Sequence, residues 1–298
     1  MQQGSPLDPT VLRAALLAIL DAAVARLTQG RRPTDRQIHD TRRALKRARA
    51  LLSLLRPVLS REDHRFCKGQ LIDAGRALAD LRDERVLQQT LRRMWRLAGL
   101  PPSSPTLRRL DRKFDKADDV QDDERRVICA SIAARNMSAA RQCLGSTSLL
   151  STSTSLLGER LRKIYRRGRR QFRSLGPSRP PTEWHEWRKL VKQYEYILEV
   201  PGPGLSGPID AAVRTAHALA HRLGEDHDLA LLLDRICTSS SGKRLPARLV
   251  DAIEERRQSL QRLALTIGAE LYADPPREIE RRLRSALRST RGRSGRGP

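Results

Sequence analysis

The sequence predicts an all-α protein, and both its composition and its periodicity point to this class. Ala, Leu, Arg and Glu dominate the 298 residues, while aromatic residues make up only 3%. Unbranched side chains lose little rotamer freedom in a helix, so this composition favours helices over strands. No stretch shows the sustained apolar–polar alternation that a half-buried strand requires. We therefore expect helices that pack on leucine and alanine.

Glycine, proline and serine clusters divide the chain into helix-period segments. These clusters predict breaks at residues 99–102, 145–155, 176–181, 201–208 and 239–246. The Ser/Thr-rich break near residue 150 lies almost at the middle of the chain, so it is the natural boundary. The expected organisation is a flexible segment (1–9), a first helical-bundle half (10–145), a linker (146–157), a second helical-bundle half (158–288) and a disordered basic tail (289–298).

An internal repeat indicates that the two halves are related. Residues 38–46 (IHDTRRALK) match residues 184–192 (WHEWRKLVK) class by class, and residues 78–87 resemble residues 223–232. The two pairs are offset by 146 and 145 residues. Because two independent motifs share nearly the same offset, the sequence predicts an internal duplication.

The charge balance predicts a polyanionic partner. Lys and Arg number 58 against 34 acidic residues, which gives a formal net charge of +24. Such an excess repels itself in a compact fold, so a partner that offsets it is expected. Nucleic acid, an anionic membrane and inorganic polyphosphate all qualify. The alternative interpretation is a surface whose charges only maintain solubility.

The repeated motif predicts a stripe of cations beside a buried apolar face. At about 100° per residue, the cations of the first copy fall within roughly 80° of the helix surface. They are His39, Arg42, Lys46 and Arg49. The apolar residues beside them are Leu45, Ala48, Leu52 and Leu55.

The second copy repeats this layout. Its cations are His185, Arg188 and Lys192, and its apolar arc is Trp184, Trp187, Val191, Tyr194 and Leu198. An ordinary surface helix carries its charges opposite the core face. Cations that flank the core face would instead line a groove between packed helices, although arginine stems that snorkel along the contact give the same pattern.

A third basic helix begins the second half. Arg162, Arg166, Arg169 and Arg173 form one stripe by their 4-3-4 spacing. This stripe either joins the same groove or is a solvated face, and the sequence does not decide between them.

These motifs, in this order and duplicated, resemble the CHAD family of conserved-histidine α-helical domains. The resemblance runs from about Thr10 to Ala286 and rests on residues 38–49 (IHDTRRALKRAR), 81–83, 185–196 and 223–228. It implies two four-helix bundles related by a pseudo-twofold around a central basic channel, and binding of long-chain polyphosphate, often at polyphosphate granules. The implied ligand contacts are His39, Arg42, Arg43, Lys46, Arg49, Arg82, His185, Arg188, Lys189, Lys192 and His227.

The sequence departs from the family pattern in two places. Glu195 stands at the position equivalent to Arg49, where it would weaken the second stripe or pair with Arg188 or Lys192. An acidic stretch also covers residues 115–124. For Asp83 and Asp228 we expect a supporting role, in which the carboxylate orients a nearby cation without touching the ligand.

Histidines in a field of cations would gain protons when a polyanion binds. Affinity is therefore expected to rise as the pH falls from about 8 to about 6, through the imidazole range. Nucleic acid is the first alternative ligand, because counterion release gives any basic protein some affinity for it. The stripes carry no interleaved aromatic residues for base stacking, so weak nucleic-acid binding is the expectation.

Enzymatic and metal-binding roles are the remaining alternatives. CHAD domains are sometimes fused to CYTH-type triphosphatases, but Glu278 and Glu280 would point about 200° apart on a helix and could not share a metal. His217 and His221 have the i, i+4 spacing of a chelating pair, yet no third ligand stands at a fixed spacing. We expect no catalysis, no cofactor and no metal.

The cysteines and the apolar runs predict where the protein resides. Four unpaired cysteines are typical of buried thiols in a reducing compartment. The N-terminal apolar run at residues 14–20 is too short to cross a bilayer. The expected location is the cytoplasm, with polyphosphate granules as one site within it.

Overall fold

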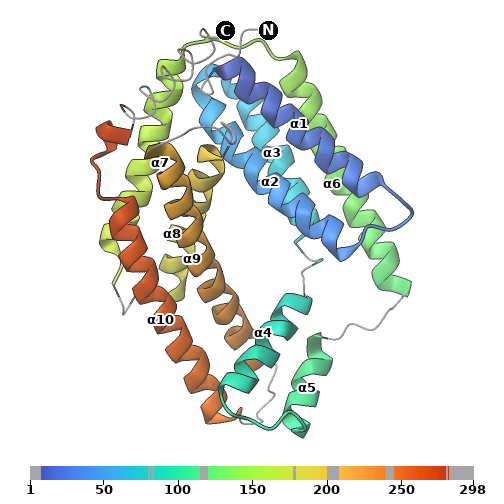
Figure 1. Ribbon diagram of the computed structural model, residues 1–298. Coiled ribbons are helices and arrows are strands. Elements are labelled where there is room, and N and C mark those ends of the chain that lie inside the picture. The colour runs from blue at the N-terminus through green and yellow to red at the C-terminus, as the bar shows by residue number, and fades with distance from the viewer. Residues whose placement is uncertain are drawn as a thin grey trace, which may run out of the picture.

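Helices form the whole of the regular structure in the described parts of the chain. The computed structural model describes residues 8–79, 81, 84–114, 120–176, 179–199, 208–238, 245–279 and 281 (Figure 1). Those ranges contain no strand, so the predicted all-α class is confirmed. The elements are α1 (Pro9–Thr28), α2 (Asp35–Leu55), the 3-10 turn η1 (Arg56–Val58), α3 (Arg61–Ala77), α4 (Glu84–Leu97), α5 (Pro105–Phe114), α6 (Val120–Ser146), α7 (Thr154–Ser174), α8 (Pro181–Leu198), α9 (Pro208–Thr238) and α10 (Ala247–Leu271).

The helix ends confirm the predicted breaks at residues 99–102, 145–155 and 176–181. Most of the predicted breaks at residues 201–208 and 239–246, and the predicted tail at residues 289–298, lie outside the described residues. α6 ends at Ser146 and α7 begins at Thr154, on either side of the Ser/Thr-rich segment. Gly99, just after α4, has φ +65°, a left-handed conformation that glycine adopts at little cost. A further turn at residues 29–34 was not predicted, and there Gly30 has φ +84°. None of the helices described is both long and apolar enough to cross a bilayer.

Four helices of the first half pack as a bundle. α1 lies against α2 and α6, and α3 lies against the same two helices (Figure 1). Leucine and alanine fill its interior, with Leu16, Leu51 and Leu71 fully buried. No aromatic side chain from these four helices is among the buried residues that the structure describes. The low aromatic content is therefore accommodated by close aliphatic packing.

α7, α8, α9 and α10 gather on the other side of the molecule. α8 packs against α7 and α9, and α9 packs against α10. An aromatic cluster joins α7, α8 and the end of α10, where the Phe172 and Trp187 ring centroids lie 5.6 Å apart. Tyr165 donates its hydroxyl to the carbonyl of Asp274 at 2.9 Å. The pseudo-twofold relation between the two groups of helices, and the channel between them, stay predictions from the sequence.

α4 and α5 extend from the first half of the sequence to helices of the second half. α4 packs against α9 and α10, and α5 packs against α4 (Figure 1). A separate hydrophobic core forms there, with Trp95 and Leu110 facing Leu232 and Ile253. Residues 84–114 thus complete a core with helices that begin more than a hundred residues later in the chain.

The four cysteines are free, but only Cys67 is buried. Cys129 and Cys143 are partly exposed and Cys237 is exposed. The prediction of buried thiols is therefore wrong for three of the four. Cys237 is exposed because it lies near the end of α9, where the helix surface faces solvent.

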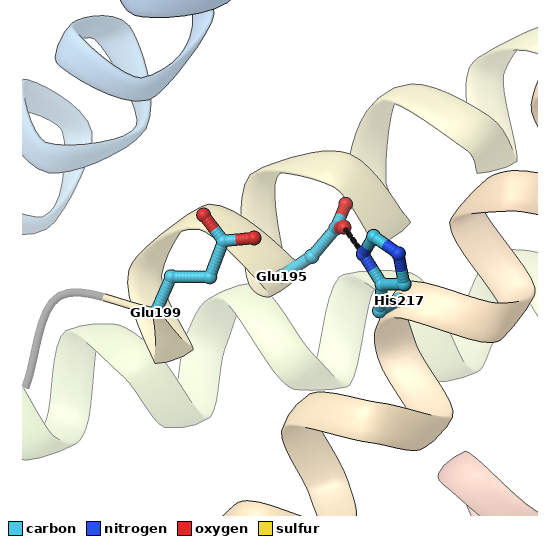
Figure 2. A group of neighbouring side chains, drawn as sticks. All are labelled: Glu195, Glu199 and His217. Carbon is cyan, nitrogen blue, oxygen red and sulfur yellow. Dashed lines mark hydrogen bonds and ion pairs between the residues drawn. The ribbon is translucent and has the colours of Figure 1, made fainter. Parts of the chain in front are cut away.

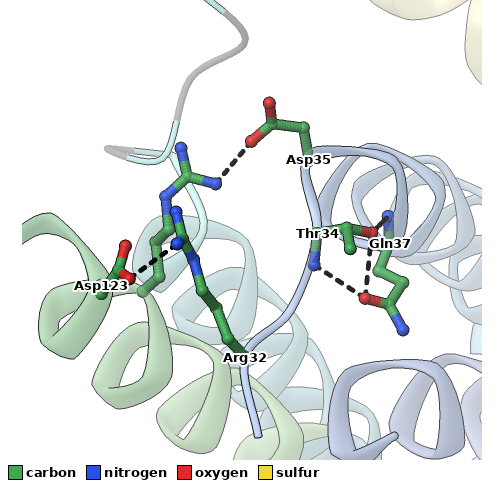
Figure 3. A network of polar contacts seen from close by, with 6 residues as sticks. Arg32, Thr34, Asp35, Gln37 and Asp123 are labelled. Carbon is green, nitrogen blue, oxygen red and sulfur yellow. Dashed lines mark hydrogen bonds and ion pairs between the residues drawn. The ribbon is translucent and has the colours of Figure 1, made fainter. Parts of the chain in front are cut away.

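The start of α2 is fixed by its own cap and by α6. Thr34 Oγ1 accepts a hydrogen bond from the Gln37 amide at 3.2 Å, and Gln37 Oε1 accepts one from the Thr34 amide at 2.7 Å (Figure 3). This capping box satisfies two amides at the first turn. Arg32 forms an ion pair with Asp123 of α6 at 2.6 Å (Figure 3). Together these contacts set the point at which α2 begins, and hence the direction of each side chain along it.

The apolar arcs predicted on α2 and α8 are buried. Leu45, Ala48, Leu52 and Leu55 are at most 3% exposed, and the five predicted residues of α8 are at most 4% exposed. α2 and α8 also pack against each other. The two copies of the repeated motif therefore lie in contact across the middle of the molecule.

A glycine of α10 allows α8 its position. If Gly268 carried a Cβ atom, that atom would lie 2.8 Å from Trp187 Cη2 and 3.0 Å from Phe172 Cδ2. Both rings belong to a packed cluster, so neither can move aside freely. Gly268 is therefore required for the close approach of α10 to α8.

We predict that Gly268→Ala lowers the free energy of unfolding by about 1–3 kcal/mol, the usual cost of overpacking a core. Denaturant unfolding measures this change. Gly69→Ala in α3 is the control, because nothing lies within 4 Å of its Cβ position. A helix-interior alanine there should stabilise by roughly 0.5–1 kcal/mol. Unchanged stability for Gly268→Ala would contradict the packing described here.

Candidate functional site

The two predicted stripes meet where α2 packs against α8. We call His39, Arg42, Lys46 and Arg49 the α2 stripe, and His185, Arg188 and Lys192 the α8 stripe. Lys46 lies at the meeting point. The positive charges of Arg188 and Lys192 on α8 repel its ammonium, as does the charge of Arg42 on its own helix. The carboxylate of Asp228 on α9 attracts the Lys46 ammonium and so opposes this repulsion. Tertiary packing thus joins cations that lie some 140 residues apart.

The crowding of cations is expressed in the pKa of Lys46. That pKa falls to about 8, first through burial and then through Arg188, Arg42 and Lys192. The side chain nevertheless keeps a solvent-exposed surface. Protein that surrounds an amine without covering it is expected at a concave surface, where hydration is reduced but a ligand can enter. Because the side chain is exposed, solvent partly screens the neighbouring charges.

His185 sits in the same field of charge. Burial lowers its pKa below the ordinary 6.5, and Lys189, Arg188 and Lys46 lower it further, while Glu186 opposes them. The sequence placed the imidazole titration between about 8 and 6. For His185 the structure moves that window downward, so its protonation requires a lower pH than that of a free imidazole.

Histidines of two different motifs meet at this end of the site. The rings of His185 on α8 and His227 on α9 have centroids 4.4 Å apart. His227 belongs to the second repeated motif, at residues 223–232. The packing of α8 along α9 brings the two motifs together. Asp228, the next residue, acts on Lys46. This arrangement supports the expected role of Asp228 as a carboxylate that orients a nearby cation.

Two polar atoms of the α8 stripe have no hydrogen-bond partner among the described residues. They are His185 Nδ1 and Arg188 Nε, and both are shielded from solvent. A buried donor without a partner costs about 1–3 kcal/mol, so such groups are normally satisfied. Acceptor oxygens of a ligand would suit the Arg188 group in particular, because a guanidinium only donates.

Glu195 interrupts the α8 stripe, as its sequence position predicted. Its carboxylate is 1% exposed and lies 2.8 Å from the ammonium of Lys192. The other oxygen lies 2.8 Å from Nδ1 of His217 on α9 (Figure 2). The predicted pairing with Lys192 is confirmed, and His217 is an additional partner. One cation of the α8 stripe is therefore held by an internal acid.

The histidine pair considered as a metal chelate is divided between two carboxylates. His217 contacts Glu195, whereas His221 contacts Glu225 at 3.0 Å. Glu195, Glu199 and His217 do bring one ligand atom each within 4.8 Å of one another (Figure 2). Lys192 already forms an ion pair with Glu195, and Arg47 forms one with Glu199 at 3.6 Å. An ion-pair network accounts for this cluster.

The other predicted contacts on α2 and α8 are exposed. Arg43 is exposed on α2. Burial raises the pKa of Tyr196 on α8, and the positive charges of Arg43 and Arg188 oppose that rise. His39 and Arg49 are exposed on α2. Lys189 is exposed and pairs with Glu186 at 2.5 Å. Arg82 and Asp83 lie outside the described residues.

The basic stripe of α7 has a structural member. Arg169 donates Nε to the carbonyl of Tyr272 at 2.9 Å and so caps the end of α10. The guanidinium therefore points to α10. The end of α10 lies against α7 because Tyr272 packs against Tyr165 in the aromatic cluster. Arg162 is partly buried and Arg166 is exposed. A ligand contact by these three arginines stays a prediction.

A cavity of about 520 Å³ adjoins the histidine pair. Its lining includes Trp184, Leu223, Leu231 and Cys237 together with His185 and His227. Glu186, Asp226 and Asp234 also line it, against the single arginine Arg257. This acidic and apolar lining does not suit a polyanion, which is better accommodated on the stripes.

Two arginines of α10 were missed at the sequence level. Arg257 lies 3.0 Å from the buried Asp226, and Arg256 lies 3.1 Å from Glu225. These ion pairs tie the second repeated motif of α9 to α10. No sequence signal could have found them, because only the packing of α9 on α10 chooses which arginines face the motif.

Together, fold and site define a helical protein with a cation-lined contact between two repeated helices. The CHAD domain family model matches residues 13–237, more than half of the chain. The chain therefore belongs to the CHAD family. PptA from Streptomyces chartreusis shares its fold, with a TM-score of 0.57 and 16% identity over 89% of this chain and 98% of that protein. No curated protein matches the sequence.

The pKa of Lys46 predicts how binding of a polyanion depends on pH. A polyanion favours the charged amine, so above pH 8 binding must first return a proton to Lys46. Affinity for long-chain polyphosphate, used as a probe, should therefore fall about tenfold between pH 7 and pH 9. Lys46→Arg keeps its charge and should lose this dependence. Identical pH profiles for the two proteins, at constant ionic strength, would contradict the assignment.

The ion pair at Glu195 predicts a gain of affinity on substitution. Glu195→Gln keeps the side-chain shape but releases Lys192, so affinity for the same probe should rise roughly threefold, the scale of one partly exposed charge pair. Glu199→Gln is the matched control, because it changes the net charge equally but releases Arg47 instead. Isothermal titration compares the two variants. An equal effect of both would mean that only net charge matters.

Proposed function

We propose that this protein binds inorganic polyphosphate at the contact between the α2 and α8 stripes. The single observation that carries the proposal is the convergence on Lys46 of Arg42, Arg188 and Lys192. Like charges brought together at a packed contact destabilise the free protein. A polyanion that lies along the contact removes this cost, which gives binding its driving force.

The chemistry of the site supports polyphosphate over other polyanions. Polyphosphate offers one charge per unit and only oxygen acceptors. Arginine forks and lysine ammonium groups satisfy such a chain without any geometry for reading bases. Membership of the CHAD family supports the same ligand, because the family resemblance implies polyphosphate binding. Location in the cytoplasm, and targeting to polyphosphate granules, belong to this proposal.

The burial of the aromatic residues argues against nucleic acid as the main ligand. Trp184, Trp187 and Tyr194 are at most 1% exposed, so none of them can stack on a base. Nucleic acid would then bind through its phosphates alone. We propose that such binding is weak and that the protein acts by binding, without catalysis.

Neutralising the four converging cations tests the proposal. The variant carries Arg42→Gln, Lys46→Gln, Arg188→Gln and Lys192→Gln, and isothermal titration with long-chain polyphosphate measures its affinity. Loss of four charge-assisted contacts should weaken binding by roughly a hundredfold and flatten the salt dependence. The control neutralises four exposed arginines of α5 and α10, namely Arg108, Arg112, Arg248 and Arg262. Equal affinity of the two variants would refute the site.

Competition separates polyphosphate from nucleic acid. Long-chain polyphosphate should displace duplex DNA from the wild-type protein at matched phosphate concentration, whereas DNA should fail to displace polyphosphate. Fluorescence anisotropy of labelled DNA follows the first exchange, and titration calorimetry follows the second. Stronger retention of DNA would favour the nucleic-acid alternative.

A further inference from the structure

The cationic face of α2 continues beyond the predicted stripe. Ser53 and Arg56 follow Arg49 at spacings of four and three residues, which extends the 3-4-3 pattern along the same helix face. From His39 to Arg56 this face runs for about 25 Å at 1.5 Å per residue. On α8 the equivalent continuation is blocked by the acidic Glu195. A polyanion that follows the cations from Lys46 is therefore led along α2.

An arginine of α7 is held at the far end of this face. Arg160 donates Nε to the carbonyl of Ser53 at 2.9 Å and Nη2 to its hydroxyl at 3.1 Å. α7 packs against both α2 and η1, which brings this guanidinium across from the second half of the chain. The two hydrogen bonds fix its position in advance of any ligand.

Five basic side chains gather there from three elements, and we call them the end cluster. They are Arg56 of η1, His64 and Lys68 of α3, and Arg160 and Arg167 of α7. Burial, then Arg56 and Arg167, lower the pKa of Arg160. Burial, then Arg56, Lys68 and Arg160, lower the pKa of His64. These electrostatic interactions agree with the packing of α7 on η1 and with the bonds of Arg160 to Ser53, which place the groups near one another.

The acidic residues Glu62, Asp63 and Glu159 adjoin the end cluster in the sequence, but among the described residues they form no ion pair with it. Within the described ranges, no carboxylate forms an ion pair with any of its five members. Elsewhere on this basic protein cations are commonly paired, as Arg141 is with Asp21 at 2.9 Å. Arginines on a merely solvated face would spread apart. Here they come together from separate elements, and one of them is anchored by two hydrogen bonds.

We propose that the end cluster is a second contact region for the polyanion, so that a single long chain lies along α2 and reaches both the α8 stripe and the end cluster. This inference rests on the proposed function and extends it to chain length. Units of one chain that bind at two linked regions bind the second region at a high effective concentration. A chain much shorter than the span gains nothing from the end cluster.

Removing two exposed members of the end cluster tests this inference. Arg56→Gln with Arg167→Gln leaves Arg160 and its bonds to Ser53 in place. Affinity for long-chain polyphosphate should fall about fivefold, the sum of two exposed charge pairs, and the salt dependence should flatten. Arg248→Gln with Arg262→Gln on α10 is the control of equal charge and exposure, and it should change affinity by less than twofold. Thermal melts establish that both variants are folded.

The outcomes separate the inference from the proposed function. Equal losses in the two double variants would overturn the role of the end cluster. Tripolyphosphate, which is too short to span α2, should bind wild type and the end-cluster variant with equal affinity in direct titration, and a fivefold loss for this short chain as well would overturn the bridging. If wild type fails to bind long-chain polyphosphate at all, the proposed function fails instead.

Discussion

The packing of α2 against α8 is the contact on which the site depends. The apolar arcs of both helices are buried in the core, and the contact between the helices brings the neighbouring cations together. Apolar burial of this size is favourable in water, and it holds like charges at a distance they would not choose. Burial, and after it the charges of Arg188, Arg42 and Lys192, lower the pKa of Lys46 at this contact. Folding stores an unfavourable electrostatic arrangement that a polyanion can relieve.

The two copies of the repeat have diverged in their electrostatics while keeping their packing. α2 continues its cations through Arg49 to Arg56, whereas α8 places the buried Glu195 against Lys192 and His217. A buried carboxylate must be paired, and the pair draws one cation out of the stripe. The proposed site is therefore asymmetric, with the longer run of cations on α2. The acidic and apolar cavity adjoins the α8 stripe at His185.

The arginine excess serves two purposes that sequence counting cannot separate. Arg169 and Arg257 satisfy a backbone carbonyl and a buried carboxylate, so they belong to the fold. Lys46 is crowded by Arg188, Arg42 and Lys192, and Nε of Arg188 has no hydrogen-bond partner among the described residues. Arg160 combines both behaviours, because its bonds to Ser53 hold it beside Arg56. Position relative to a neighbouring helix decides which role an arginine takes.

The sequence by itself determined the helical class, the breaks and the buried faces of α2 and α8. These features follow from local periodicity and turn residues, which act within a few positions of the chain. It also placed Glu195 in the stripe, because the repeat aligned it with Arg49. Only the tertiary structure decided which cations meet, which ones cap α10, and that α4 joins α9 and α10. Those choices depend on which helix faces pack together, and residues more than a hundred positions apart carry no local signal of their contact.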